Sequence, residues 1–214
     1  SDKLKIIIIS GRTGTGKTRI LEELEKRGEN IIDLEHLARH RGSLLGSLPG
    51  IEQPQQKLFE TLLCNKIKSL KFENPVFIEA ESSKIGNVQI PSPLWRAMRV
   101  SPQILVTSDR SRRADYLLKD YVNLKTNQKG LFALLQLLEK SGLHTVAEKC
   151  RIFIAEEDWT SLANMLLQSH YDKKYDRSIK SHGRKTIMEL ALPDLKQKNF
   201  KSLAKIISKT QLEI

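Results

Sequence analysis

The chain has 214 residues, of which 39% are hydrophobic and 29% are charged, and its formal net charge is +11 at pH 7. This length and apolar content suit one α/β domain with an insertion, or two small domains, and they exclude an intrinsically disordered chain. No apolar run approaches the roughly 20 residues that a membrane-spanning helix needs. Because the chain also starts directly with a strand pattern instead of a signal peptide, we expect a cytoplasmic protein with no membrane partner.

The positive charge is concentrated toward the end of the chain. From residue 171 onward there are eleven Lys and Arg against five Asp and Glu. Clustered cations favour a nucleic-acid partner, since they release counterions from the phosphate backbone. A solvated lysine-rich surface without a partner explains the charge equally well.

The first predicted strand is a run of four isoleucines at residues 6–9, and a phosphate-binding motif follows it. The pattern G-x-x-x-x-G-K-[ST] is formed by Gly11, Arg12, Thr13, Gly14, Thr15, Gly16, Lys17 and Thr18. Its glycines permit a tight turn whose N–H groups point at an anion, and the helix that starts near Gly16 adds its dipole. Lys17 is expected to reach the outer phosphates and Thr18 to bind magnesium. The motif predicts a phosphate-binding loop.

A second strand is predicted at residues 30–34, with acidic and basic side chains around and after its end. Asp33 and Glu35 lie where ligands of open α/β sheets collect. We expect Asp33 to be a catalytic residue that acts on the substrate, although capping a helix is the alternative role. The density of His and Arg that follows suits phosphate contact, so His40 and Arg41 are predicted to bind RNA.

A helix at residues 58–70 and strands at 76–79 and 104–107 come next. Glu79 and Glu81 follow the third strand, and either is expected to bind magnesium. We assign Glu79 to the metal with Thr18, and Glu81 to catalysis with Lys17 and Asp33. After the fourth strand, Arg110 and Arg113 are candidates for a lid over the phosphates, with solvated helix charge as the alternative.

The remaining chain is predicted to be helical at 130–168, a strand at 186–192 and a closing helix at 200–207. Together the elements predict an α/β, P-loop NTPase-like fold with a doubly wound, mainly parallel five-stranded sheet and a helical insertion. We expect a P-loop core at 1–128 with the first four strands, the helical insertion at 129–170, and a basic segment, fifth strand and closing helix at 171–214. The basic residues of this last segment that we expect to bind RNA are Lys173, Lys174, Arg177 and Arg184.

The motifs in this order resemble one family, the tRNA 2-selenouridine synthases, whose members join a rhodanese-like domain to a P-loop domain. Besides the phosphate loop, the resemblance rests on residues 33–43, 53–60, 79–86, 109–113, 120–121 and 170–175. It implies a transferase that converts the wobble 2-thiouridine of tRNA to 2-selenouridine through an S-geranyl intermediate, with selenium from selenophosphate. The implied partner is tRNA, and the implied ligands are magnesium and geranyl diphosphate. A nucleoside triphosphate stays open, since backbone amides recognise phosphates whatever these are attached to.

The sequence departs from the family pattern because only five residues precede the first strand. We therefore expect the rhodanese-like domain, with its reactive cysteine, to be supplied by a separate chain or to have been removed, and the isolated chain to be unable to complete selenation. Neither of the two cysteines replaces it. Cys64 is predicted to be a reduced thiol on the apolar face of a helix, where its nucleophilicity is low.

Two alternatives belong to other classes. A small-molecule kinase for a nucleoside or metabolite would use ATP and magnesium, with Lys17, Arg110 and Arg113 stabilising the moving phosphoryl group. It accounts for the loop but not for the basic tail. A non-catalytic RNA-binding protein would bind a nucleotide without turnover.

Overall fold

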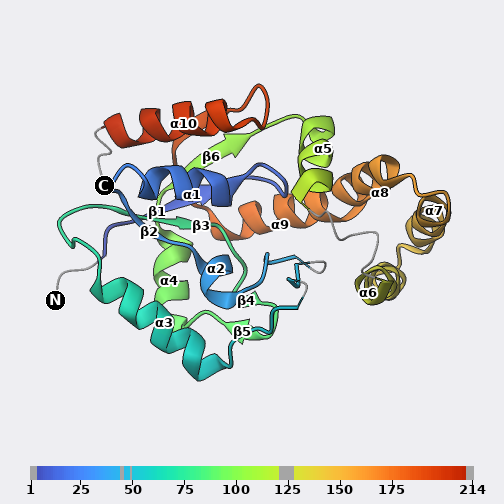
Figure 1. Ribbon diagram of the computed structural model, residues 1–214, viewed down its shortest axis with the longest axis horizontal. Helices are drawn as coiled ribbons and strands as arrows, with labels where there is room; N and C mark the ends of the chain where they lie inside the picture. Colours follow the sequence, from blue (N-terminus) through green and yellow to red (C-terminus); the bar gives the residue numbers. More distant parts are fainter. Residues whose placement is uncertain (1–3, 44–45, 49, 121–127, 211–214) are drawn as a thin grey trace.

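The computed structural model describes residues 4–43, 46–48, 50–120 and 128–210 and has the predicted α/β architecture. A five-stranded sheet in the order β2-β3-β1-β6-β7 forms its centre (Figure 1), and every neighbouring pair is parallel. The strands are β1 (Ile6–Ser10), β2 (Asn30–Ile32), β3 (Val76–Glu79), β6 (Gln103–Thr107) and β7 (Thr186–Ala191). All five predicted strands are therefore confirmed, within one or two residues at their ends.

The run of isoleucines in β1 serves two hydrophobic cores at once. Successive side chains of a strand point to opposite faces, so Ile6 and Ile8 enter one core while Ile7 and Ile9 enter the other. The first core is closed by α2 (Leu34–Ala38), α3 (Gln56–Lys68) and α4 (Ser92–Val100). The second is closed by α1 (Lys17–Glu25) and α10 (Gln197–Lys209), which pack on each other. The central strand is thus fixed from both sides.

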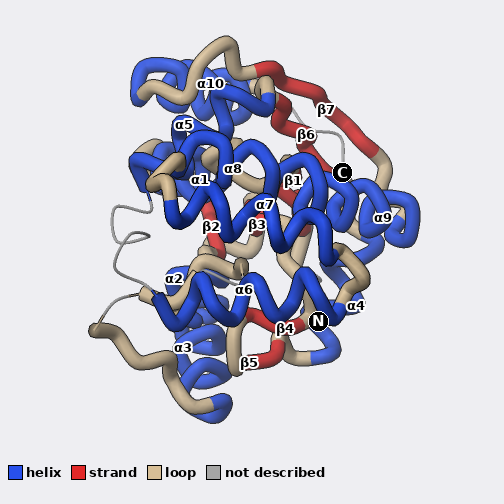
Figure 2. Tube along the Cα trace, turned by 90° about the vertical axis from the view of Figure 1, so that its right-hand side faces the viewer, coloured by secondary structure: helices blue, strands red, loops and turns tan. Residues whose placement is uncertain are grey.

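Apart from short turns at 141–143 and 156–158, the described residues from 110 to 182 are helical. It forms α5 (Arg110–Asp120), α6 (Gln128–Lys140), α7 (His144–Ala155), α8 (Trp159–Leu166), the π-helix η2 (Leu167–Tyr171) and α9 (Asp172–His182). Helices α6, α7 and α8 enclose a small core of their own around Leu134, Leu138 and Leu162. Figures 1 and 2 show these three helices at one end of the molecule, from which α9 runs back toward the sheet. The division of the chain at 128/129 and 170/171 stays a prediction, and residues 121–127 lie outside the described part.

Several elements were not predicted. They are α2, α4, α9 and a hairpin of β4 (Lys84–Ile85) and β5 (Val88–Gln89). The prediction for Cys64 was wrong, because its thiol is exposed. On α3 the buried residues are Phe59 and Leu63, and Cys64 lies one position, or about 100°, further around the helix. Within the described residues, no helix has the length and apolar character needed to cross a membrane.

Candidate functional site

The phosphate loop joins the end of β1 to the start of α1, and its glycines are sterically required. Gly14 and Gly16 have φ angles of +84° and +75°, which L-residues rarely adopt. A Cβ on Gly16 would stand 2.6 Å from the ring of Phe200 in α10, and one on Gly11 would stand 2.6 Å from Thr15 Oγ1. Lys17 Nζ lies 3.4 Å from the carbonyl oxygen of Gly11, across the turn. The loop therefore has the tight shape that the motif predicts.

Two carboxyl groups lie beside the loop. Thr18 Oγ1 donates a hydrogen bond of 3.3 Å to Glu35 Oε2, and Glu35 shares a hydrogen bond with Glu81. Burial, and then the negative charge of Glu81, raise the pKa of Glu35 to about 8, although Lys17 opposes this. Burial raises the pKa of Glu81 as well. Gly42 approaches the pair so closely that a Cβ there would stand 2.5 Å from Glu81 Oε2. The pair holds a proton near neutral pH when no cation is bound.

Glu79 is buried and hydrogen bonded to the backbone, and its assignment to a metal with Thr18 stays a prediction. Its side chain is 1% exposed and Oε1 accepts a 2.9 Å hydrogen bond from the backbone N–H of Glu35. Burial holds its pKa well above the ordinary value, and it is absent from the cavity wall on which Glu81 lies. Glu79 supports the first turn of α2. Glu35, which the sequence placed at the same edge of the sheet without a role, takes the position beside Thr18.

Asp33 has the capping role that the sequence left open as an alternative. It is the N-cap of α2, and its carboxylate accepts a 2.7 Å hydrogen bond from the N–H of His36. Burial raises the pKa of Asp33. Asp33 also lines the cavity, so a catalytic role for it stays a prediction.

The oxygen atoms around Thr18 fit magnesium chemically. Hydroxyl and carboxylate oxygens are the ligands that Mg²⁺ prefers, and a divalent cation relieves the repulsion of two crowded carboxylates. Among the described residues, no three His, Cys, Asp or Glu side chains converge to hold a metal by themselves. This agrees with the usual mode for Mg²⁺, in which one or two protein groups act together with substrate phosphates and water. Thr18, Glu35 and Glu81 are the residues that would hold it.

Arg113 is not a lid residue. It is 1% exposed and donates two hydrogen bonds to the carboxylate of Asp172, at 2.9 and 2.8 Å. It also donates to the carbonyl oxygens of Thr13, at 3.0 Å, and Ser108, at 3.2 Å. This face of α5 packs against the phosphate loop, so Arg113 supports the loop from behind. Arg110 is exposed at the start of α5 and does not line the cavity.

Helix α9 is tied to the phosphate loop by polar contacts. Arg12 Nη2 donates to both carboxylate oxygens of Asp176, at 2.8 and 3.1 Å. The hydroxyl groups of Ser10 and Tyr175 hydrogen bond at 2.9 Å. With the pair formed by Arg113 and Asp172, these contacts set the position of α9 relative to the loop. Apart from the family resemblance at residues 170–175, the sequence did not predict these contacts, because each one joins positions more than 50 residues apart.

The predicted RNA-binding residues fall into different environments. Lys173, Lys174 and Arg177 are exposed on α9, and Lys174 also lines the cavity. His40 is only 9% exposed, and burial lowers its pKa. His40 is therefore mostly neutral at pH 7, and its role in RNA binding stays a prediction. The other two residues, Arg41 and Arg184, are partly buried and line the cavity.

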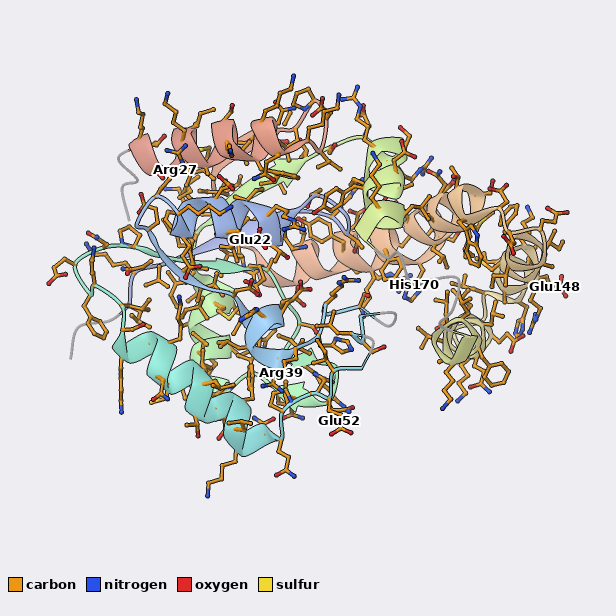
Figure 3. All side chains as sticks on the ribbon, in the orientation of Figure 1. Glu22, Arg27, Arg39, Glu52, Glu148 and His170 are labelled. Atoms are coloured by element: carbon orange, nitrogen blue, oxygen red, sulfur yellow. The ribbon has the colours of Figure 1, made fainter. Side chains whose placement is uncertain are left out.

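A cavity of about 1360 Å³ connects these groups. The phosphate loop, Asp33, Glu35 and Glu81 form one part of its wall, and α9 with η2 forms another. Figure 3 labels four further residues of its lining, which are Glu22, Arg39, Glu52 and His170. The site can therefore hold an anion at the loop and a second, larger molecule beside it.

Comparison with known proteins agrees with the resemblance seen in the sequence. The family described as tRNA 2-selenouridine synthase AAA domain matches residues 4–152. A tRNA 2-selenouridine synthase of Nitrosomonas europaea is 35% identical over 125 residues, which cover 57% of this chain and 32% of that protein. The enzyme of the same name from Marinobacter nauticus is 30% identical over 186 residues, which cover 82% of this chain and 48% of that protein. The chain thus spans half or less of the length of these curated relatives.

Similarity to solved structures is weaker. A tRNA delta(2)-isopentenylpyrophosphate transferase from Staphylococcus epidermidis aligns over 97% of this chain and all of its own, with 14% identity and a TM-score of 0.44. Shikimate kinase from Acinetobacter baumannii aligns over 97% of this chain and 93% of its own, with 16% identity and a TM-score of 0.41. The match over residues 4–152, well over half of the chain, settles the family. This chain belongs to the tRNA 2-selenouridine synthase AAA domain family.

Proposed function

We propose that this chain is the P-loop part of a tRNA-modifying transferase that converts wobble 2-thiouridine to 2-selenouridine through an S-geranyl intermediate. The observation that carries the proposal is a single cavity whose wall contains a phosphate loop, an acidic pair and a basic helix. The relatives are tRNA 2-selenouridine synthases, which supports tRNA as the substrate. Because the chain spans half or less of their length, we assign to it the binding of donor and tRNA and the prenyl transfer, and not the complete reaction.

The phosphate loop is the proposed site for the diphosphate of the donor. Its N–H groups and Lys17 would hold the phosphate oxygens. Magnesium, held by Thr18, Glu35 and Glu81, would neutralise phosphate charge when bound. In the transfer step the sulfur of 2-thiouridine forms a bond to C1 of the geranyl group, the C1–O bond breaks, and diphosphate leaves with the electron pair. The N3 proton of 2-thiouridine is released to water, so the S-geranyl product is neutral.

Apolar side chains in the same cavity support a prenyl donor. Those that line it are Leu48, Ile51, Trp95, Leu117, Leu137 and Ile179. Covering a ten-carbon chain removes apolar surface from water, at about 25 cal/mol per Å². A nucleoside triphosphate is the competing ligand, and it fits the loop equally well but makes less use of the apolar wall.

The basic surface of α9 is the proposed contact for tRNA. Lys173 and Arg177 are exposed on it, and Lys174 reaches from this surface into the cavity wall. A strand of RNA that follows these cations is led toward the donor site. The net charge of +11 favours association with a polyanion in addition to these local contacts.

Separate titrations of donor and tRNA test the proposal. With Mg²⁺ present, we expect calorimetry to show binding of geranyl diphosphate, and Lys17→Ala to abolish it. Filter binding should show tRNA affinity that falls steeply with salt, and Lys17→Ala should retain that affinity. Lys68→Ala removes an exposed lysine of α3 and is the matched control that changes neither.

Three outcomes would contradict parts of the proposal. Tight binding of ATP without binding of geranyl diphosphate would refute the prenyl donor and favour the kinase alternative. Absence of salt-dependent tRNA binding would refute the RNA substrate. Equal loss of both ligands in Lys17→Ala would show that the two sites are not distinct.

A further inference from the structure

Arg184 is a cation on the cavity wall whose hydrogen-bonding capacity is only partly used. It lies between the end of α9 and the start of β7 and lines the cavity. Its Nε donates a 3.0 Å hydrogen bond to the carbonyl oxygen of Met98. Its Nη2 is buried and has no hydrogen-bond partner among the described residues. A buried donor without a partner is unfavourable, so a ligand that accepts a hydrogen bond from the guanidinium group relieves this cost.

The surroundings of Arg184 favour an anion as that ligand. Within the described part of the chain, no carboxylate forms an ion pair with Arg184. Burial lowers the pKa of Arg184, as does the positive charge of Arg99, whereas Tyr175 opposes this. A guanidinium group binds a phosphate through two parallel hydrogen bonds. An anionic group in the cavity therefore completes this site.

Tyr175 lies near both the phosphate loop and Arg184. Tyr175 hydrogen bonds to Ser10, the last residue before the loop, and the charges of Arg12 and Arg184 both act on its phenol group. The donor diphosphate has the loop amides and Lys17 for its own charge. Arg184 and Lys174 both line the cavity. We therefore expect a second anion, which belongs to the acceptor, to bind Arg184.

We infer that Arg184 binds one backbone phosphate of the RNA inside the cavity, next to the nucleotide that is modified. This inference rests on the proposed function and specifies how its acceptor is held. A phosphate that belongs to a polymer fits better than an isolated acid, because cations continue outward from Lys174 to Lys173 and Arg177 on the exposed face of α9. Arg184 is then a positioning residue for the acceptor nucleotide, and the lysines of α9 supply general affinity.

Arg184→Met tests the inference in the complete chain, with a tRNA transcript and Mg²⁺ pyrophosphate as probes. We expect tRNA affinity to fall about tenfold or more, since a hydrogen-bonded charge contributes about 1.5–3 kcal/mol. The slope of log K against log salt should decrease by about 1. Pyrophosphate affinity should be unchanged. Arg112→Met, which removes an exposed arginine of α5 outside the cavity, is the matched control and should leave tRNA affinity within about twofold.

Ethylation interference distinguishes one phosphate from a general charge effect. In the wild type, ethylating the phosphates contacted by protein should block binding, and in Arg184→Met the block should disappear at one phosphate or two adjacent ones. Arg184→Lys keeps the positive charge but lacks the planar guanidinium group that forms two parallel hydrogen bonds. Ethylation of the same phosphate should therefore interfere less with binding of this variant than with binding of the wild type. If Arg184→Met does not fold, Arg184→Lys carries the test.

Specific results would overturn the inference. An unchanged interference pattern, or a uniform weakening at every phosphate, would show that Arg184 does not contact a single phosphate. A parallel loss of pyrophosphate affinity would place Arg184 in the donor site. Absence of tRNA binding by the wild type would refute the proposed function itself, whereas normal binding by both proteins would refute only the role of Arg184.

Discussion

Removing Asp172 should destabilise the protein strongly. Arg113 is 1% exposed and is neutralised by Asp172 through two hydrogen bonds. In Asp172→Ala the guanidinium stays buried with only the carbonyl oxygens of Thr13 and Ser108 as partners. Breaking a buried ion pair from one side costs about 3–5 kcal/mol. For a chain of this size, where 1 kcal/mol shifts the midpoint by about 2–4 °C, the melting temperature should fall by about 6–20 °C.

Thermal unfolding followed by circular dichroism, with urea unfolding at 25 °C, measures this loss. Asp176→Ala is the matched control, because it removes a half-exposed carboxylate that pairs with Arg12, and such pairs contribute at most about 1 kcal/mol. Replacing both charges, as Arg113→Met with Asp172→Leu, should recover much of the stability, since no buried charge remains. Equal, small losses in Asp172→Ala and Asp176→Ala would refute the reasoning that the buried pair supports the loop.

Two further substitutions test other parts of the site. Gly16→Ala should lower pyrophosphate affinity and stability, because its Cβ would stand 2.6 Å from Phe200. Gly28→Ala is the control for backbone strain, since Gly28 has a similar φ of +83° but lies in open space. Equal effects of the two substitutions on stability and affinity would contradict the predicted clash. His40→Asn should reduce the pH dependence of the free energy of unfolding. The pKa of His40 in the folded protein lies below its ordinary value of 6.5. Its contribution to stability is therefore complete above pH 6.5 and is lost as the pH falls through the lowered pKa. Urea unfolding at pH 7.5 and pH 5.5 measures the difference between wild type and variant, and a difference that does not change with pH would argue against burial as the cause.

The sheet and the phosphate loop could be predicted because their signals are local. Four successive isoleucines identify a strand with both faces buried, and the structure shows two cores that use alternate side chains of this strand. The spacing of glycines before Lys17 reports steric limits that act within a few residues. Both features could therefore be predicted from residues that are close together in the sequence.

The roles of individual charged residues could not be predicted in the same way. Arg113 lies in a run of arginines that suits a mobile lid, but its partner Asp172 is 59 residues away in the sequence. Glu35 and Glu79 lie at the same edge of the sheet, and only the packing of α2 decides that one faces the cavity while the other accepts from the backbone. Burial of His40 depends likewise on its pairing with Ser47 in a short bridge. Tertiary contacts, which one sequence does not display, decide these roles.

Hydrogen bonds of the phosphate loop join α9 to the proposed donor site. Ser10, Arg12 and Thr13 are successive or nearly successive residues, and each is joined to Tyr175, Asp176 or the Arg113–Asp172 pair. The basic face of α9 is therefore positioned by the same residues that shape the phosphate loop. Glu35 and Glu81 approach the loop from the opposite edge of the sheet through Thr18 and Lys17. A diphosphate in the loop would consequently lie between an acidic wall suited to a metal ion and a basic wall suited to RNA, with Tyr175 and Ser10 where the loop meets the basic wall.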